Sequence, residues 1–290
     1  MLTRYAPSPT GHLHLGHVVN AIYVWGLARA AGGRVLLRME DHDRIRCRPG
    51  YESSILEDLD WLGFQPDAGL HPLLRQSDRD DIYRDALERL RRTHHVYACE
   101  CSRKHIAGEC YDGFCRDRGL TEASDRGVRV RIDEGVERFD DLLLGVIEHE
   151  PVRQCGDLLL RDRDGNWTYQ FTVTVDDMMQ EITDIIRGED LAASTGRQLR
   201  LRQMLGGAGR PRFAHHPLIL KPGGEKLSKS AADTGVRDLR QSGLTPAEVI
   251  GRAAAAVGLI DQFTPVPAHR VADVFRDWPR AGRIHRASSR

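Results

Sequence analysis

The sequence lacks any hydrophobic run of the roughly 18–20 residues that a membrane-spanning helix needs. It also lacks a basic-then-apolar leader at its N-terminus, so we expect a cytoplasmic protein. The net charge is zero, because 42 basic residues balance 42 acidic ones. The overall charge therefore does not indicate a polyanionic partner. Internal repeats, low-complexity segments and any feature that indicates a membrane or protein partner are missing. What is left is an ordinary globular composition, 40% hydrophobic and 29% charged, in 290 residues that suffice for one large domain or two smaller ones.

Cysteine is scarce and unevenly distributed. The chain has six cysteines, and four of them fall within one short segment: Cys99, Cys101, Cys110 and Cys115. In a cytosolic chain such clustering favours a metal site over disulfide bonds. A C-x-C pair with a later cysteine suits Zn²⁺, which takes about four tetrahedral ligands. The fourth ligand could be Cys110, Tyr111 or His105, and thiolate chemistry alone favours Cys110.

Strand and helix signals alternate from the N-terminus. The patterns predict a strand at residues 2–7, a mostly apolar helix at residues 15–31 and a continuous apolar strand at residues 34–40. Such a βαβ unit has parallel strands and a right-handed crossover, so the sequence predicts an α/β fold. Further helices are predicted at residues 51–62, 78–92, 195–207 and 245–259, and further strands at residues 128–132, 145–151, 157–162, 167–177, 181–191 and 214–220.

The composition changes near Val96, and this change divides the chain. We expect residues 99–150 to form an insertion with the metal site, between residues 1–98 and 151–230, the two halves of one α/β domain. Residues 231–290 are expected to form a small helical region whose helix begins with a capping box at Thr245 and Glu248. Its end, from Arg270 onward, carries six arginines against two aspartates and could contact phosphates or simply be solvated.

The stretch RYAPSPTGHLHLGH, residues 4–17, lies where the first predicted strand is followed by the first predicted helix. A helix N-terminus binds anions, because its backbone N–H groups are unpaired and its dipole adds roughly half a positive charge. Gly11 and Gly16 would let a ligand approach the backbone closely, and His14 and His17 can donate hydrogen bonds to phosphate oxygens. A metal site is the weaker interpretation here, because no third ligand is evident nearby.

A second motif, EKLSKS at residues 225–230, lies in a glycine-rich loop after a late strand. A cationic loop rich in hydroxyls suits the clamping of a triphosphate and the neutralisation of charge as pyrophosphate leaves. An ordinary solvated loop has a similar composition, so this motif indicates phosphate binding only together with His14 and His17.

The two motifs together resemble the HIGH and KMSKS signatures of class I aminoacyl-tRNA synthetases. RYAPSPTGHLHLGH together with LLRMEDHD is similar to the glutamyl branch of that class, and the resemblance extends to about residue 235. It implies a Rossmann-like parallel-sheet catalytic domain with Mg²⁺ accompanying ATP. The implied ATP-binding residues are His14, Gly16, His17, Lys226 and Lys229, of which His14, His17 and Lys229 would be catalytic.

A glutamate substrate needs a cation for its side-chain carboxylate and an acceptor for its ammonium group. Arg4 and Glu40 end the first two predicted strands, at the sheet edge where ligands of parallel sheets bind. Arginine pairs with a carboxylate in a bidentate and discriminating way, and Glu40 would accept from the ammonium. The resemblance extends the glutamate-binding set to Arg4, Tyr5, Ala6, Pro7, Ser8, Glu40, Tyr169 and Arg187. Without it, Tyr169 would be interpreted as a core aromatic and Arg187 as a surface arginine.

Three features narrow the resemblance to one family. Glutamyl-tRNA synthetases commonly have an asparagine four residues after this tyrosine, where the chain has Val173. They also carry a long anticodon-binding region, for which residues 231–290 are too short. The pattern C-x-C…Y-x-x-x-C is characteristic of the short glutamyl-queuosine tRNA(Asp) synthetases, and it favours Cys99, Cys101, Tyr111 and Cys115 as ligands of one structural Zn²⁺. The loop motif departs from its signature at Leu227, which replaces methionine and changes no charge.

The resemblance implies a two-step reaction. ATP and L-glutamate would give glutamyl-adenylate, and the glutamate would then pass to the queuosine base at the wobble position of tRNA(Asp), with the region after residue 231 a candidate contact surface. The alternative is a truncated glutamyl-tRNA synthetase that charges the 3′ end of tRNA(Glu). A nucleotidylyltransferase of the same superfamily would need no amino-acid pocket, and a non-catalytic RNA-binding relative would need no phosphate clamp. His12 has no assigned role.

Overall fold

The computed structural model describes residues 1–43, 45–102, 106, 110–219 and 235–276. Its first three elements form the expected βαβ unit: β1 (Leu2–Tyr5), α1 (Leu15–Ala30) and β2 (Arg34–Leu37). The two strands are parallel, with Leu2 opposite Arg34 and Tyr5 opposite Leu37, which confirms the predicted α/β start. Side chains of α1 are buried on most of its surface, so the helix forms the centre of the largest apolar cluster in the described chain.

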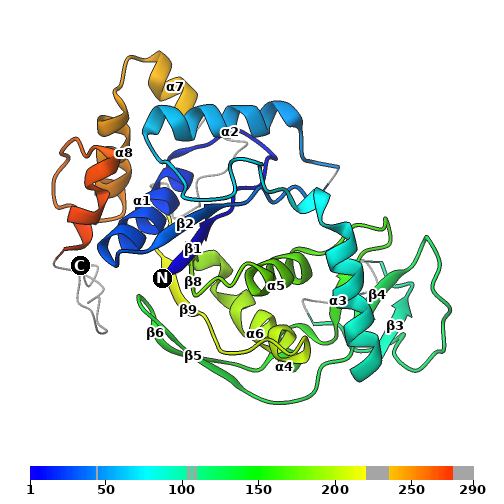
Figure 1. Cartoon of the computed structure of the whole chain (residues 1–290). Coiled ribbons are helices and arrows are strands. Elements are labelled where there is room, and N and C mark those ends of the chain that lie inside the picture. Colours follow the sequence, from blue (N-terminus) through cyan, green and yellow to red (C-terminus); the bar gives the residue numbers. More distant parts are fainter. Residues whose placement is uncertain (44, 103–105, 107–109, 220–234, 277–290) are drawn as a thin grey trace.

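Two later strands, β8 (Asp184–Gly188) and β9 (Arg212–His216), are also parallel, with Arg187 opposite His215. The start of β8 lies beside β1, because the Thr183 N–H donates to the Leu2 carbonyl oxygen at 2.9 Å. Figure 1 shows β1, β2, β8 and β9 in the middle of the molecule, with α1 and α2 (Pro49–Leu62) on one side and α5 (Tyr169–Met179) and α6 (Thr195–Met204) on the other. The carboxyl ends of β1 and β8 therefore lie close together, which is where ligands bind in open α/β sheets.

A hairpin extends this second sheet. β5 (Glu137–Asp141) and β6 (Gly145–His149) are antiparallel, and β5 pairs in parallel with β9 where Asp141 meets Phe213. The strand order is β6-β5-β9-β8. Residues 137–149 thus share a sheet with the later part of the chain, while the proposed division at residues 99 and 150 stays a prediction.

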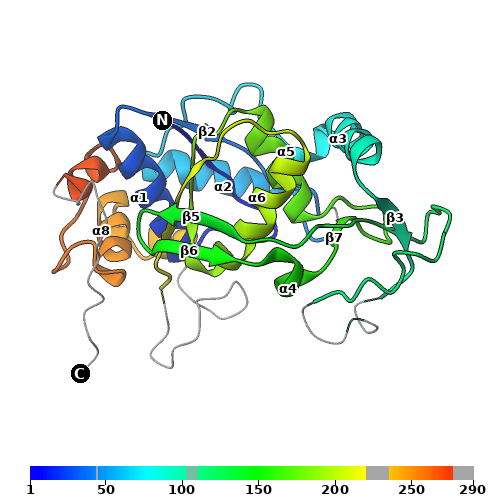
Figure 2. The same ribbon diagram turned by 90° about the horizontal axis from the view of Figure 1, so that it is seen from below.

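A separate three-stranded sheet contains β3 (Val96–Cys99), β4 (Gly127–Val130) and β7 (Leu158–Arg161), in the order β3-β4-β7. Both of its pairings are antiparallel. Figure 2 shows β3 and β7 toward one end of the molecule, well separated from α8 (Pro246–Ala256) at the other end. The short helix α4 (Pro151–Cys155) leads into β7.

One predicted strand is wrong. Residues 167–177 contain mostly aromatic and β-branched residues, but α5 (Tyr169–Met179) is a helix. Its β-branched residues are accommodated because Thr172 and Thr174 donate to the carbonyl oxygens of Thr168 and Gln170, four residues earlier. Phe171 and Val175, one turn apart, are buried in the same apolar cluster. Tertiary burial on both helix faces outweighs local strand propensity here.

The other predicted helices are confirmed within a few residues. They are α2 (Pro49–Leu62), α3 (Asp80–Thr93), α6 (Thr195–Met204) and α8 (Pro246–Ala256), joined by α7 (Val236–Gln241) and the 3-10 segments Gln76–Asp78, Glu189–Ser194 and Ala268–Phe275. The capping box of α8 is present, since Thr245 and Glu248 bond to each other's backbone. The predicted strand at residues 214–220 ends at His216. In the described residues we find no helix of the length and apolarity needed to span a bilayer.

Candidate active site

A cavity of about 650 Å³ opens at the carboxyl ends of β1 and β8 and at the start of α1. Most predicted substrate residues line it together: Arg4, Ala6, Ser8, His14, Gly16, His17, Glu40, Tyr169 and Arg187. Two predicted residues do not. Tyr5 is buried against Trp25, and the Pro7 carbonyl oxygen accepts from the Glu40 N–H at 3.0 Å. Lys226 and Lys229 lie outside the described residues, as does His105.

The histidines cap α1. The His14 backbone N–H donates to Nδ1 of His17, and the Gly16 N–H donates to Nδ1 of His14, both at 3.1 Å. With Nδ1 as an acceptor, the proton of each neutral imidazole is on Nε2. The ring centroids lie 4.0 Å apart, so two N–H donors are held side by side at a helix N-terminus. This is the donor arrangement that a phosphate group requires.

His12 lies outside this arrangement. Its Nδ1 is 2.8 Å from Oγ of Ser54, and its ring meets that of Tyr51 edge to face. These contacts tie the loop before α1 to α2.

Beneath the cavity lies a cluster of buried charges that sequence reasoning missed. Arg38 is fully buried, and its guanidinium bonds to Glu40 at 3.0 Å and Asp177 at 2.8 Å, with Asp176 at 3.7 Å. Burial alone would lower the pKa of Arg38, but the three carboxylates raise it above its ordinary value. Arg4 also pairs with Asp177, at 3.2 Å. The carboxylates of this cluster are therefore held in place by arginine partners.

Arg187 has a different environment. It is only 3% exposed, yet its guanidinium donates to neutral groups: His215 Nε2 at 3.1 Å, Gln198 Oε1 at 2.8 Å and Thr195 Oγ1 at 2.8 Å. No carboxylate within the described residues forms an ion pair with it. Burial lowers the pKa of Arg187, because its charge is only partly compensated. A buried cation of this kind on a cavity wall favours an anionic ligand.

Tyr169 and Val173 differ in their position on α5. Tyr169 is the first residue of the helix and lines the cavity, where burial raises the pKa of its phenol. Val173 is 1% exposed and is not among the residues that line the cavity. The position that departs from the glutamyl-tRNA synthetase pattern is therefore filled by a buried apolar side chain.

The cysteine segment forms a compact group at the end of β3. The Sγ atoms of Cys99, Cys101 and Cys115 lie within 4.8 Å of one another, an arrangement that could hold a metal ion. The Tyr111 hydroxyl is 3.6 Å from Cys99 Sγ, whereas the exposed Cys110 is 3.4 Å from the Val152 carbonyl oxygen instead.

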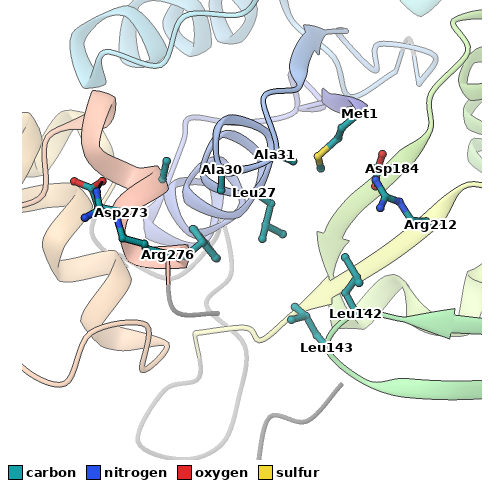
Figure 3. A pocket seen from close by; sticks show the side chains of 12 residues that line it. Met1, Leu27, Ala30, Ala31, Leu142, Leu143, Asp184, Arg212, Asp273 and Arg276 are labelled. Carbon is teal, nitrogen blue, oxygen red and sulfur yellow. Dashed lines mark hydrogen bonds and ion pairs between the residues drawn. The ribbon is translucent and has the colours of Figure 1, made fainter. Parts of the chain in front are cut away.

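A second cavity, of about 760 Å³, is formed by the N-terminus, the end of α1 and the tip of the β5–β6 hairpin. Figure 3 shows its apolar walls, including Leu27 and Leu142, and the charged pair Asp184 and Arg212. Asp184 and Arg212 form an ion pair with each other at 2.7 Å. The residues that line this cavity include no predicted site residue. The convergent polar groups lie in the first cavity.

Other cavity residues gave no clear sequence signal. Asn20 and His216 line the cavity although neither belongs to a predicted motif, and His42 lines it from within LLRMEDHD, where no role was predicted for it. His216 stacks on Tyr23, and its Nε2 lies 3.2 Å from the Asn20 side chain, which ties β9 to α1. The doubled aspartate near the end of α5 and the arginine two residues before Glu40 were the only available hints of the charge cluster.

Comparisons with known proteins agree with this geometry. Residues 1–252 match the catalytic domain of class I tRNA synthetases, E and Q type. A glutamyl-Q tRNA(Asp) synthetase from Pseudomonas aeruginosa is 42% identical over 268 residues, covering 88% of this chain and 90% of that protein. The enzyme of the same name from Rhodobacter capsulatus is 40% identical over 276 residues, covering 86% of this chain and 98% of that protein.

A solved structure is similar over most of the chain. It is a glutamate tRNA ligase from Elizabethkingia meningosepticum in complex with its amino acid, with a TM-score of 0.77 and 28% identity. The match covers 94% of this chain but only 64% of the ligase, so the chain spans less than two thirds of that protein's length. The expected Rossmann-like α/β fold is confirmed, and the chain belongs to the glutamyl-Q tRNA(Asp) synthetase family of class I tRNA synthetases.

Proposed function

We propose that this protein activates L-glutamate with ATP and transfers it to the queuosine base of tRNA(Asp). One observation carries the activation step: a buried arginine with neutral partners, Arg187, lines the same cavity as the buried carboxylate of Glu40. A free amino acid with an anionic side chain presents the complementary charges, because its ammonium needs an acceptor and its side-chain carboxylate needs a cation.

Within this pocket each charged group has a distinct task. Arg187, with Arg4 beside it, binds the side-chain carboxylate, and Tyr169 closes the wall between them. Glu40 accepts from the ammonium group while Arg38 holds one of its oxygens. Since Arg38 and Asp177 fix one another, the pocket is organised before the substrate arrives, which favours orientation of the reacting carboxylate.

The ATP phosphates bind at the start of α1. The Nε2 protons of His14 and His17 and the backbone of Gly16 face the polyphosphate, and Mg²⁺ accompanies ATP. The α-carboxylate of glutamate attacks the α-phosphorus, a P–O bond forms, the bond to the β-phosphate breaks, and pyrophosphate leaves. We assign Lys226 and Lys229, which lie outside the described residues, to the neutralisation of that leaving charge.

In the second step a hydroxyl of queuosine attacks the carbonyl carbon of glutamyl-adenylate. An ester bond forms, the acyl–phosphate bond breaks, and AMP leaves with the electron pair. The names of the relatives, glutamyl-Q tRNA(Asp) synthetases at 40–45% identity, support this acceptor. Because its substrates are ATP and tRNA, we place the reaction in the cytoplasm.

We also propose that the cysteine group holds one structural Zn²⁺ with Tyr111 as the fourth ligand. The three cysteine Sγ atoms lie close enough together to bind one ion, and cysteine thiolates are ligands that tetrahedral zinc prefers. The position of the Tyr111 hydroxyl beside Cys99, and of Cys110 beside a carbonyl oxygen, supports tyrosine over the fourth cysteine. The ion would stabilise the loop between β3 and β4, which has little apolar content of its own.

The activation step is tested by amino-acid-dependent exchange of pyrophosphate into ATP without tRNA. We expect exchange with L-glutamate and at least about a hundredfold less with L-glutamine and L-aspartate, because a buried arginine with only neutral hydrogen-bond partners among the described residues disfavours a neutral amide, and a shorter chain misplaces the carboxylate. Comparable exchange with glutamine, or exchange only with an uncharged amino acid, would overturn the proposal.

A further inference from the structure

Arg187 is held by a chain of three buried side chains. The Asp141 carboxylate, at the end of β5, lies 2.6 Å from His215 Nδ1, and His215 Nε2 lies 3.1 Å from Arg187 Nε. His215 is on β9, directly opposite Arg187 on β8. The side chains of Asp141 and His215 are completely buried.

The donors and acceptors in this chain can be assigned without ambiguity. Arginine has only donors, so Nε2 of His215 must accept from Arg187. Asp141 is ionised: burial alone would raise its pKa, but hydrogen bonds from His215, Leu143 and Leu144 bring it below its ordinary value. An ionised carboxylate only accepts, so Nδ1 of His215 must donate. His215 is therefore neutral with its proton on Nδ1, in agreement with burial lowering its pKa.

We infer that Asp141 and His215 are positioning residues of the amino-acid pocket, which fix the His215 tautomer and thereby the orientation of Arg187 toward the substrate carboxylate. This inference deepens the proposed function and rests on it. Asp141 does not line the cavity, so its effect passes through His215. The arrangement fixes a guanidinium that forms no ion pair with a carboxylate in the described part of the chain, which keeps its charge available to the ligand.

Two further contacts support a purpose beyond packing. The Thr195 hydroxyl accepts from Arg187 Nη2 at 2.8 Å and lies 3.2 Å from His215 Nε2, so the guanidinium is linked to His215 both directly and through Thr195. Asp141 Oδ1 also accepts from the N–H groups of Leu143 and Leu144, at 2.9 and 3.0 Å, which anchors the carboxylate to the hairpin turn. The His215 backbone N–H also donates to this carboxylate, at 3.2 Å from Oδ2, so all three backbone contacts are independent of the His215 side chain.

Asp141→Asn tests the tautomer directly. The asparagine keeps the shape, and its oxygen can still accept from the hairpin N–H groups, but its NH₂ donates to Nδ1 and moves the histidine proton to Nε2. Two donors then face each other at Arg187. We expect the KM for glutamate in pyrophosphate exchange to rise about tenfold or more, with the KM for ATP and kcat changed less than about threefold. Asp140→Asn, at the exposed neighbouring position, is the matched control and should change neither KM.

Substitution of His215 separates positioning from folding. Gln can place its side-chain oxygen where Nε2 accepts from Arg187, whereas Leu cannot. We expect His215→Gln to stay within about threefold of wild type in the KM for glutamate, and His215→Leu to match Asp141→Asn. In the double variant Asp141→Asn, His215→Gln, the KM should fall back toward wild type, because no tautomer remains to be disturbed. A double variant worse than either single one would mean a purely structural role.

The ring protonation is read independently of activity by nitrogen NMR of histidine-labelled protein, with the His215 signals identified by their loss in His215→Gln. We expect the Nδ1–H tautomer in wild type and the Nε2–H tautomer in Asp141→Asn. The same tautomer in both proteins, or an unchanged KM for glutamate in Asp141→Asn, overturns the inference. If wild type shows no glutamate-dependent exchange, the proposed function fails instead, and the NMR comparison still decides the tautomer.

Discussion

At the scale of single residues, two buried arginines with opposite surroundings explain the candidate site. Arg38 is surrounded by carboxylates and is structural, because its charge is satisfied within the protein. Arg187 donates to an imidazole, an amide and a hydroxyl, and we propose that the substrate carboxylate compensates its charge. The same residue type thus serves two purposes, and the partners rather than the burial distinguish them.

Replacement of Arg187 tests this distinction. Arg187→Met keeps much of the volume and removes the charge, so we expect the KM for glutamate to rise at least about a hundredfold while the KM for ATP changes less than about threefold. Pyrophosphate exchange measured against each substrate gives both values. Arg212→Met, on the neighbouring strand and 62% exposed, is the control and should leave both unchanged. Equal effects of Arg187→Met on the two substrates would remove Arg187 from the pocket.

Asp58 predicts a pH dependence of stability. It is buried on α2, its Oδ2 has no hydrogen-bond partner among the described residues, and burial raises its pKa to about 6. The folded state therefore holds a proton that the unfolded chain releases above its ordinary pKa of 3.8, so stability falls as pH rises from about 4 to 6.

Asp58→Asn removes this cost. We expect the free energy of unfolding to rise by up to about 3 kcal/mol at pH 7.5 and to be nearly unchanged at pH 4. Urea denaturation at the two pH values measures the difference, with the exposed Asp60→Asn as control. A gain of the same size at both values would contradict the assignment.

The sequence indicated the residues that belong to compact motifs and missed those that depend on distant contacts. His14 and His17, and Arg4 with Glu40, follow from strand ends and a helix start, which are local features. Arg38, Asp177 and His215 each also depend on a partner far away along the chain: Arg38 and Asp177 bond to each other, and His215 bonds to Asp141. No local pattern distinguishes such residues from ordinary surface charges.

At the scale of secondary structure elements, α1 organises both the site and the core. Its N-terminus holds the two histidines, and its sides are covered by β1, α8 and the 3-10 segment Ala268–Phe275. The βαβ start was predictable because apolar runs, glycines and a strand-to-helix transition agree with one another. The helix α5 was not, because threonine and valine favour a strand locally and only burial on all sides makes the helix preferable.

Two helical glycines predict opposite effects on stability. A Cβ on Gly26 would lie 2.1 Å from the Phe275 ring. Gly26→Ala should therefore destabilise the protein by about 1–3 kcal/mol, although alanine has a better helix propensity than glycine. At Gly50, near the start of α2, such a Cβ would have no atom of the described residues within 4 Å, and Gly50→Ala should stabilise by about 0.5–1 kcal/mol. Thermal and urea denaturation measure both.

The contact with Phe275 can be confirmed by compensation. Adding Phe275→Leu to Gly26→Ala should restore part of the lost stability, because the smaller side chain makes room. A Gly26→Ala variant more stable than wild type would show that this close approach does not exist.

The metal proposal belongs to the segment between β3 and β4. We expect one zinc per chain by elemental mass spectrometry, retained in Cys110→Ser and lost in Cys101→Ser. Tyr111→Phe should weaken retention against a chelator, and metal removal should lower the melting temperature. Zinc lost in Cys110→Ser but retained by Tyr111→Phe would reverse the assignment of the fourth ligand.

At the scale of the whole molecule, the strands that carry the site come from distant parts of the chain. β1 and β2 bring the histidine turn and Glu40, while β8 and β9 bring Arg187 and His215. The hairpin β5–β6 supplies Asp141 from between them and joins the same sheet as β8 and β9 (Figure 1). The βαβ start and the family resemblance were predictable from the sequence. The pairing of residues 137–149 with β9 was not, because it joins segments that are far apart along the chain.

The destination of the glutamate tests the account as a whole most directly. Purified protein is incubated with labelled L-glutamate, ATP and tRNA(Asp) with or without queuosine, and with tRNA(Glu); nuclease digestion then separates the anticodon fragment from the 3′ adenosine. We predict label only on queuosine-containing tRNA(Asp), in the anticodon fragment. Label on the 3′ adenosine of tRNA(Glu), or on tRNA that lacks queuosine, would contradict the proposed acceptor and favour a glutamyl-tRNA synthetase activity instead.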